Sequence, residues 1–261
     1  MPELPEVETY KTYIDSTSLH QRIISIDCKD NRLLKKPKAD FDNFLCNEEF
    51  TKTKRIGKYL FLETTGNQIL VMHFGMTGRP HYYKSEEERP KFGHIQISFE
   101  SGFHFAFENK RKFGWWDLID SIEDFKSSHN LSDDARDLSL EDFKDALSNR
   151  KTDIKKIIMD QSVAAGVGNW MADEILYQSK IHPKRRVDDM TETEVESVFK
   201  AMKKVIEVAI KNEAHYEDFP KKILMHFRKE DAICFHTSCN IQMIKVGGRT
   251  TYFSSEWQQL E

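Results

Sequence analysis

The segment from Asp160 to Glu174, DQSVAAGVGNWMADE, restricts the fold of this chain more than any other stretch. Gly166 and Gly168 interrupt two apolar runs with helical spacing, and glycine permits the positive φ angles that tight turns need. We therefore predict a helix, a glycine turn and a second helix, with Asn169 capping the second helix. Free amides at the start of that helix would form an anion site. The pattern is typical of a helix–two-turn–helix, although a purely structural helical hairpin has the same pattern.

The rest of the chain divides by the spacing of its apolar residues. Residues 3–15 have the apolar stripe and acidic first turn of a helix. Between about 21 and 120, short β-rich runs separated by polar clusters predict a sandwich or barrel. Examples of these runs are Arg22–Cys28, Tyr59–Thr64, Gln68–His73, His94–Phe99 and Phe103–Phe107. Residues 121–140 are interpreted as a connector, helical periodicity returns over 141–212, and residues 226–261 end in a hairpin around Gly247-Gly248.

Length and composition are consistent with a multidomain α+β protein. The 261 residues suit two modest domains or one large one, and 39% hydrophobic residues with 11% aromatics exclude global disorder. The apolar runs are too short to span a bilayer, and the acidic start lacks the features of a signal peptide. We expect a soluble intracellular protein that does not bind membranes. The net charge of −4 means that any DNA-binding surface must be a local basic patch.

The first six residues, MPELPE, contain a potential nucleophile. Removal of Met1 would leave Pro2 with a free secondary amine, which is partly neutral at physiological pH. Such an amine can attack an aldehydic carbon and form an iminium. Glu3 and Glu6 lie close enough in sequence to donate or accept protons. The alternative is that Pro2 is a processing signal and that the acids only begin a helix.

Three further segments combine cations, glycines and exposed apolar residues. Lys58 follows Gly57 at the start of a strand, where it is either a solvated strand end or a cation at the rim of the β domain. The loop HFGMTGRP starts at His73 and carries Met76. Met76 is either a core residue or a wedge that fills the gap left by an extruded base. The run NKRKFGWW, over residues 109–116, suits phosphate neutralisation and base stacking, or a charged turn before a buried strand.

The four cysteines are too few for a disulfide framework, and Cys28 and Cys46 are interpreted as packing residues. Cys234 and Cys239 suggest zinc, but a closed structural site needs four ligands. The region where a second pair would lie, 252–258, has neither Cys nor His. We therefore expect no cofactor and no zinc.

Taken together, the motifs PELPEVE, GKYLF, HFGMTGRP, KRKFG and DQSVAAGVGNWMADE occur in the order found in the formamidopyrimidine-DNA glycosylase / endonuclease VIII family. The chain resembles that family over nearly its whole length. The hairpin GGRTTYF, residues 247–253, is similar to the family's finger. The resemblance implies an N-terminal catalytic β-sandwich domain (1–130), a helix–two-turn–helix DNA-binding domain (131–225) and a C-terminal finger (226–261).

The resemblance also implies roles for individual residues. Pro2 would attack the sugar C1′, Glu3 would protonate the opening deoxyribose, Lys58 would contact a phosphate near the flipped nucleotide, and Glu6 would support the site. The remaining implied roles are DNA contacts by Met76, Arg111, Phe113, His73, Lys155, Asn169 and Arg249, and a structural role for Glu174. Among the contacts, Met76, Arg111 and Phe113 resemble the intercalating trio, and Asn169 and Arg249 resemble the phosphate-pinching pair.

The implied activity is that of a bifunctional DNA glycosylase/AP lyase that acts on damaged double-stranded DNA as a monomer in the cytoplasm or nucleoid. The sequence departs from the family pattern at three places. Ser254 and Trp257 stand where the second cysteine pair would be, as in zincless fingers, and Asn109-Lys110 replaces a frequent Asp-Pro. Residues 213–233 lack a glycine-containing lid segment, which favours oxidised pyrimidines and ring-opened or hydantoin purines as substrates. The alternatives are a preference for 8-oxoguanine, a non-catalytic sensor of damaged DNA and a zinc-dependent interaction module.

Overall fold

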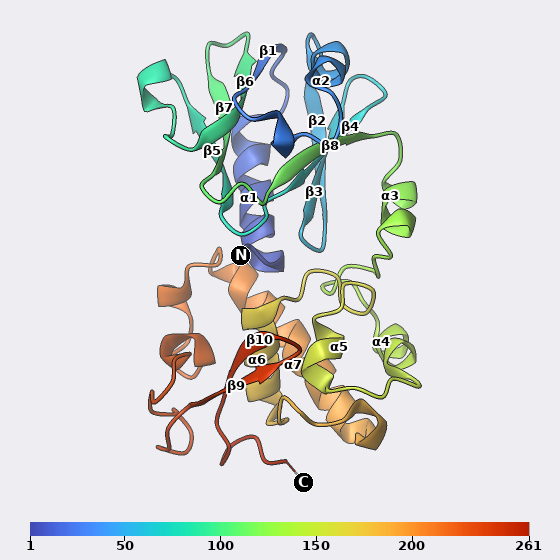
Figure 1. The fold of residues 1–261 in the computed structure, drawn as a ribbon, viewed down its shortest axis with the longest axis vertical. Helices are drawn as coiled ribbons and strands as arrows, with labels where there is room; N and C mark the ends of the chain where they lie inside the picture. The colour runs from blue at the N-terminus through green and yellow to red at the C-terminus, as the bar shows by residue number, and fades with distance from the viewer. Residues whose placement is uncertain (261) are drawn as a thin grey trace. The chain divides into compact units, whose positions relative to one another are not determined.

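A computed structural model describes residues 1–260 (Figure 1). Residue contacts divide the chain into two compact units. Unit 1 contains Met1–Pro2 and Glu6–His129, and unit 2 contains Glu3–Pro5 and Asn130–Glu261. The three-domain division at residues 130 and 225 stays a prediction.

Unit 1 is a β-sandwich with a helix against it, as the sequence predicts. Its helices are α1 (Leu4–Thr17), α2 (Lys38–Leu45) and α3 (Ile122–Ser128), with short 3-10 turns at Asn31–Leu33 and Glu86–Glu88. Its strands are β1 (Ile23–Cys28), β2 (Phe50–Ile56), β3 (Tyr59–Thr64), β4 (Ile69–His73), β5 (Gly78–Tyr83), β6 (Gly93–Phe99), β7 (His104–Asn109) and β8 (Trp115–Ile119).

The strands form two antiparallel four-stranded sheets, ordered β1-β6-β7-β5 and β2-β3-β4-β8. One hydrophobic core joins them. The first sheet contributes residues such as Ile97 and Phe107, the second contributes Leu60 and Trp116, and α1 contributes Val7. Because alternate strand residues point to opposite faces, this shared core identifies a sandwich.

The interpretation of residues 121–140 as a connector missed helix α3. Ser121 caps this helix by accepting the N–H of Asp124, and Ile122 and Phe125 are buried. The sequence therefore contained a helix signal, a Ser cap followed by two acids in the first turn, within a polar segment.

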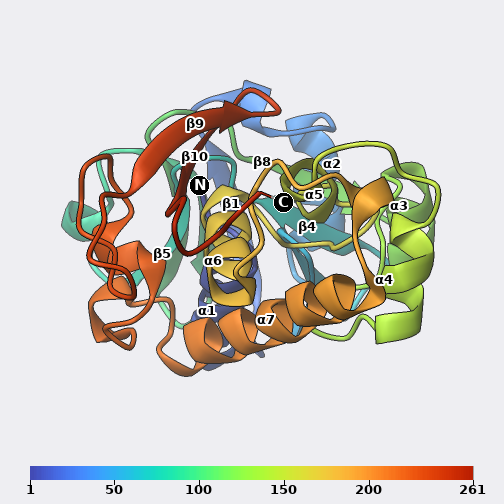
Figure 2. The same cartoon turned by 90° about the horizontal axis from the view of Figure 1, so that it is seen from below.

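Unit 2 contains the predicted helical region and the C-terminal hairpin. Its elements are α4 (Leu140–Leu147), α5 (Ile154–Ile158), α6 (Asn169–Ser179), α7 (Glu192–Lys211), the 3-10 turns Val187–Asp189, Tyr216–Asp218 and Leu224–Phe227, and strands β9 (Gln242–Val246) and β10 (Arg249–Phe253). Helix α6 is buried along most of its length, and the amphipathic α7 packs against it (Figure 2). Leu4 contributes to the core of this unit, together with residues of α4, α5, α6 and α7.

Strands β9 and β10 pair antiparallel around the predicted turn at Gly247 and Gly248, where both glycines have positive φ. Strand β10 contacts α6. A two-stranded hairpin is marginally stable by itself, so this contact with a buried helix is what fixes its position.

Candidate active site and DNA interface

The carboxylate of Glu3 lies at the N-terminus of α6. Its two oxygens accept the backbone N–H groups of Trp170 at 3.0 Å and Met171 at 3.2 Å, and its exposed fraction is 2%. The first amides of a helix favour negative charge, so this position stabilises the carboxylate. The anion site predicted at this helix start therefore exists, but an acidic side chain of the protein itself occupies it.

The two glycines of the turn have different roles. Gly166 has a φ of +107°, as predicted, and its carbonyl accepts the N–H of Leu4 at 3.1 Å. Gly168 has an ordinary extended backbone, and a Cβ at this position would lie 2.2 Å from Cδ of Glu3. Glycine is therefore required at 168 by the close approach of Glu3, and not by its φ angle.

The prediction that Asn169 caps the helix was wrong. Helix α6 begins at Asn169, preceded by Gly168, because Glu3 supplies the acceptor that an N-cap side chain would otherwise provide. The side chain of Asn169 instead donates to the carbonyl of Thr250 on β10 at 2.9 Å. Asn169 thereby lies next to Arg249, the residue proposed to bind phosphate with it, and Arg249 is exposed.

Pro2 precedes Glu3 in the chain and is half-buried. Glu6 is also half-buried, one turn into the N-terminal segment. Its negative charge acts on Tyr10, whose pKa is raised to about 12 by burial and then by Glu6.

Lys58 lies in the tight turn between β2 and β3, beside Gly57, whose φ is +58°. The buried side chain of Arg55 holds this turn, since it donates to the Gly57 carbonyl at 3.0 Å and to Glu8 on α1 at 2.6 Å. Arg55 therefore links the turn to α1, and this link also restricts the position of the Lys58 backbone.

His73 ends β4 close to Lys58 and Lys35. Burial, followed by the positive charges of Lys58 and Lys35, lowers the pKa of His73 to about 4. Its ring stacks on Trp115, with centroids 5.4 Å apart, and its Nδ1 accepts the N–H of Gly75 at 3.3 Å. The neutral imidazole thus holds the start of the loop that carries Met76.

Met76, Arg111 and Phe113 lie on two loops that contact each other. A Cβ on Gly75 would lie 2.3 Å from the backbone of Phe113, and the hydroxyl of Thr77 accepts the N–H of Arg111 at 3.0 Å. Met76 and Phe113 are 39% and 56% exposed, values that a core role for Met76 does not explain. The Arg111 guanidinium lies 5.2 Å from the Phe113 ring centroid. The structure therefore brings the predicted trio together at the surface of unit 1.

Lys155 and Glu174 are buried in unit 2. The Lys155 side chain has no exposed surface, and its ammonium donates to Asp173 at 2.5 Å and to the hydroxyl of Thr251 at 2.6 Å. Glu174 accepts the N–H of Met225 at 3.2 Å, and burial raises its pKa to about 7. Lys155 therefore contacts the finger hairpin, whereas Met76, Phe113 and Arg249 among the other predicted DNA contacts are exposed.

The side chains of the finger do not fit a zinc site. Sγ of Cys234 lies 3.2 Å from the hydroxyl of Tyr177, and the ring of Trp257 stacks on His236 with centroids 4.1 Å apart. The Trp257 indole N–H donates to the carbonyl of Tyr177 at 2.9 Å. Among residues 1–260, no group of three His, Cys, Asp or Glu side chains is arranged to hold a metal ion.

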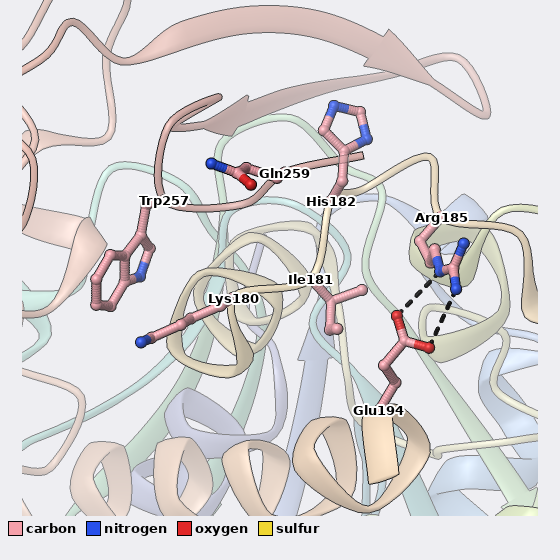
Figure 3. A pocket seen from close by; sticks show the side chains of 7 residues that line it. All are labelled: Lys180, Ile181, His182, Arg185, Glu194, Trp257 and Gln259. Carbon is pink, nitrogen blue, oxygen red and sulfur yellow. Dashed lines mark hydrogen bonds and ion pairs between the residues drawn. The ribbon is translucent and has the colours of Figure 1, made fainter. Parts of the chain in front are cut away.

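A polar pocket of about 260 Å³ lies at the other end of α6 (Figure 3). It is lined by Lys180, Ile181, His182, Arg185, Glu194, Trp257 and Gln259. Glu194 and Arg185 form an ion pair at 3.0 Å on one side of it, opposite Lys180 and Trp257 (Figure 3). Since Glu3 lies at the start of α6 and this pocket at its end, the pocket is separate from the predicted site. Within the part of the chain that the structure describes, no helix is long and apolar enough to cross a membrane.

Sequence reasoning missed three residues that organise the site: Arg55, Thr77 and Asp173. Arg55 and Thr77 act through hydrogen bonds to residues distant in sequence, for which no local pattern gives a signal. Asp173 did have a signal, because it belongs to a pair of acids, with Glu174, that is flanked by apolar residues in a helix buried along most of its length.

Comparison with known proteins agrees with this fold. Residues 1–116 match the profile of the formamidopyrimidine-DNA glycosylase N-terminal domain, and residues 131–219 match that of the H2TH domain of the same enzyme. A formamidopyrimidine-DNA glycosylase of Desulforamulus reducens is 32% identical, with 99% of each chain covered. One of Arabidopsis thaliana is 30% identical over all of this chain and 71% of its own length. The crystal structure of Lactococcus lactis Fpg (MutM) with DNA containing N7-benzyl-Fapy-dG superposes with a TM-score of 0.91 at 26% identity, covering 99% of this chain and 100% of that one.

The chain combines a β-sandwich, a helix–two-turn–helix domain and a C-terminal β-hairpin. This combination defines the class of helix–two-turn–helix DNA glycosylases. Within this class, the chain belongs to the formamidopyrimidine-DNA glycosylase family. It is a base-excision repair enzyme, a DNA glycosylase with AP lyase activity.

Proposed function

We propose that the protein removes oxidised bases from double-stranded DNA through a covalent intermediate on Pro2. The observation that carries this proposal is the anchoring of Glu3, the residue next to Pro2, by two amides at the start of α6. A carboxylate held in this way is preorganised, so its position does not depend on side-chain flexibility.

In the proposed reaction, the Pro2 nitrogen attacks C1′ of the flipped nucleotide and the bond from C1′ to the base breaks. The proton that the nitrogen loses balances the proton that the departing base takes up. Glu3 gives a proton to the ring oxygen as the deoxyribose opens, leaving an iminium between Pro2 and C1′. The iminium acidifies the C2′ proton, whose removal expels the 3′ phosphate, and a second elimination expels the 5′ phosphate. Lys58 binds a nearby phosphate, and Glu6 supports the site.

We assign the DNA contacts to two groups of residues, one on the loops of unit 1 that carry Met76 and Phe113, and one around Asn169 and Arg249 of unit 2. Met76, Arg111 and Phe113 fill the space that the flipped base leaves, which suits their exposed positions on two joined loops. His73 holds the first of these loops, and Asn169 and Arg249 bind backbone phosphates. Lys155 acts indirectly, through its bonds to β10. The enzyme works as a monomer, without zinc, where DNA is present.

Borohydride trapping tests the covalent step. We expect the wild-type protein to be trapped on abasic-site DNA, and Pro2→Gly to be trapped much less because the secondary amine is lost. A preparation that retains Met1 has an acylated Pro2 nitrogen and serves as a control. Equal trapping of that preparation would refute the role of Pro2, because another amine would then form the covalent bond. Absence of trapping in the wild-type protein would instead favour the non-catalytic sensor of damaged DNA.

We further propose that oxidised pyrimidines and ring-opened or hydantoin purines are better substrates than 8-oxoguanine. In support, residues 213–233 contain no glycine, and the structure attaches this segment to α6. Tyr216 and Phe219 pack on Trp170, and the N–H of Met225 bonds Glu174. A segment attached in this way is poorly suited to serve as a flexible lid that reads the edge of an oxidised purine.

Related structures contain both kinds of lesion, since Lactococcus lactis Fpg has been solved with Fapy-dG DNA and a MutM with carbocyclic 8-oxo-G DNA. Single-turnover rates on matched duplexes decide between them. We expect dihydrouracil and hydantoin lesions to be excised faster than 8-oxoguanine opposite cytosine, since bases that pair and stack poorly cost less to flip. The reverse order would support the 8-oxoguanine-preferring alternative.

A further inference from the structure

Asp173 is a buried acid on α6 around which residues from three segments of unit 2 meet. Its Oδ1 accepts from Lys155 of α5 at 2.5 Å. Its Oδ2 accepts from Nε and Nη2 of Arg228 at 2.9 and 2.6 Å, and from the backbone N–H of Tyr252 on β10 at 3.3 Å. The carboxylate has no exposed surface. Two cations and one strand amide therefore converge on a single buried side chain.

The bonds to β10 place the strand against α6 at two successive points. Asn169 and Asp173 are four residues apart, so they lie on the same face of the helix. Asn169 bonds the carbonyl of Thr250, and Asp173 bonds the N–H of Tyr252. These backbone groups are two residues apart, and both lie on the edge of β10 that does not pair with β9. The register of the strand along the helix is thereby fixed.

Lys155 and Arg228 strengthen the same attachment. Lys155 also donates to the hydroxyl of Thr251 and, at 3.4 Å, to the carbonyl of Thr250. The Arg228 guanidinium lies 5.0 Å from the ring centroid of Tyr252. Burial lowers the pKa of Lys155, while the charges of Asp173 and, more weakly, Glu3 act in the opposite direction. Without the Asp173 charge, two cations would remain close together in the interior, which is strongly unfavourable.

We propose that Asp173 is a positioning residue for DNA binding: by holding Lys155, Arg228 and β10 together, it places Arg249 beside Asn169. Arg249 directly precedes Thr250, the residue whose carbonyl is fixed to Asn169. This inference rests on the proposed role of Arg249 as a phosphate contact. It assigns Lys155 to the support of the finger.

Two measurements on the full-length protein test the proposal. Asp173→Asn keeps the shape of the side chain but removes its charge and one of its acceptors. Hydrogen–deuterium exchange without DNA should show faster exchange in the peptide covering residues 249–253, and unchanged exchange in α4. Glu196→Gln is the matched control, because Glu196 forms ion pairs with Lys144 and Lys200 on an exposed part of the same unit.

DNA affinity is measured on a duplex with a tetrahydrofuran abasic analogue at one salt concentration. We expect Asp173→Asn and Arg249→Ala each to weaken binding roughly tenfold, and the double variant to be little weaker than either one. Arg228→Met, which changes a partly exposed partner, should reproduce the Asp173→Asn result if the latter folds poorly.

The outcomes separate the two proposals. If the effects of Asp173→Asn and Arg249→Ala multiply, Asp173 does not act through Arg249 and the inference is wrong. Unchanged exchange in residues 249–253 would also refute it. If exchange rises as expected but Arg249→Ala binds like wild type, the attachment exists and the proposed phosphate contact by Arg249 is wrong.

Discussion

At the scale of single residues, Gly168 is the position where the smallest change has the largest expected effect. A Cβ there would lie 2.2 Å from Cδ of Glu3, so Gly168→Ala must displace the proposed acid. Misplacing a catalytic group by about 1 Å costs on the order of 100-fold in rate, and we expect at least this loss in single-turnover base release. The control is Gly66→Ala, whose Cβ would lie 3.3 Å from the Glu48 side chain and 3.5 Å from Oγ1 of Thr64. Wild-type rates for Gly168→Ala would show that Glu3 does not need its present position.

His73 makes the stability of the enzyme depend on pH. Its pKa is about 4 in the folded protein, through burial and then Lys58 and Lys35, against an ordinary value of 6.5. Between these values the unfolded chain binds more protons than the folded one, so stability falls as pH drops through this window and is unaffected above it.

We therefore expect acidification from about pH 7.5 to about pH 4.5 to destabilise wild type more than His73→Asn, by about 2 kcal/mol. Asparagine retains an acceptor for the N–H of Gly75, so the loop itself should be preserved. Urea unfolding at both pH values measures the difference. Equal losses in the two proteins would show that His73 is not the titrating group.

At the scale of elements, the finger is held by side-chain packing around Trp257 and Gln258. Trp257 stacks on His236, donates to Tyr177, and has the Lys180 ammonium 4.2 Å from its ring centroid. Gln258 adds two bonds, accepting the N–H of Ser254 and donating to the carbonyl of Ile181. These contacts attach the C-terminal residues to the end of α6.

We expect the purified protein to contain no stoichiometric zinc and to bind DNA equally well with and without a chelator, because a structural zinc ion is tightly linked to folding. Trp257→Ala should lower the free energy of unfolding of the finger by about 2 kcal/mol, since much of a large aromatic contact is lost. Elemental analysis and hydrogen exchange of residues 234–258 are the measurements. Stoichiometric zinc with chelator-sensitive binding would contradict this account.

At the scale of the whole molecule, the charge balance requires DNA binding to be local. The chain has 39 Lys and Arg against 43 Asp and Glu, and many of its cations form ion pairs, such as Lys112 with Asp30 at 2.8 Å. We expect DNA affinity to fall with salt, and Arg249→Ala to weaken binding to damaged and undamaged duplexes alike while reducing the log–log salt slope by about 1. DNA titrations of both proteins over a range of salt concentrations measure the affinity and this slope. An unchanged slope would exclude a phosphate contact by Arg249.

Most of the architecture was predictable from the sequence, because periodicity and glycine positions are local signals. The sandwich, helix α1, helix α6 after the glycine turn and the hairpin follow from them. Residues 160–165, predicted as the helix before the turn, are not helical, because α5 already ends at Ile158, and strands β2, β5 and β8 were not among the runs named from the sequence. The contacts between distant segments were not predictable. The capping of α6 by Glu3 joins residues 167 positions apart, and the burial of Lys155 depends on Asp173 and Thr251. Such contacts are properties of the folded chain, and a lysine in the sequence looks the same whether it faces DNA or an aspartate.

The anchoring of Glu3 by main-chain amides has an evolutionary consequence. Every residue except proline supplies the same N–H group, so substitutions at positions 170 and 171 leave the hydrogen bonds to Glu3 in place. Changes of the side chains of Trp170 and Met171 therefore affect packing and not these bonds, whereas a change at Glu3 or Gly168 acts on them directly. The packing around the acid can therefore change while its two main-chain hydrogen bonds are kept.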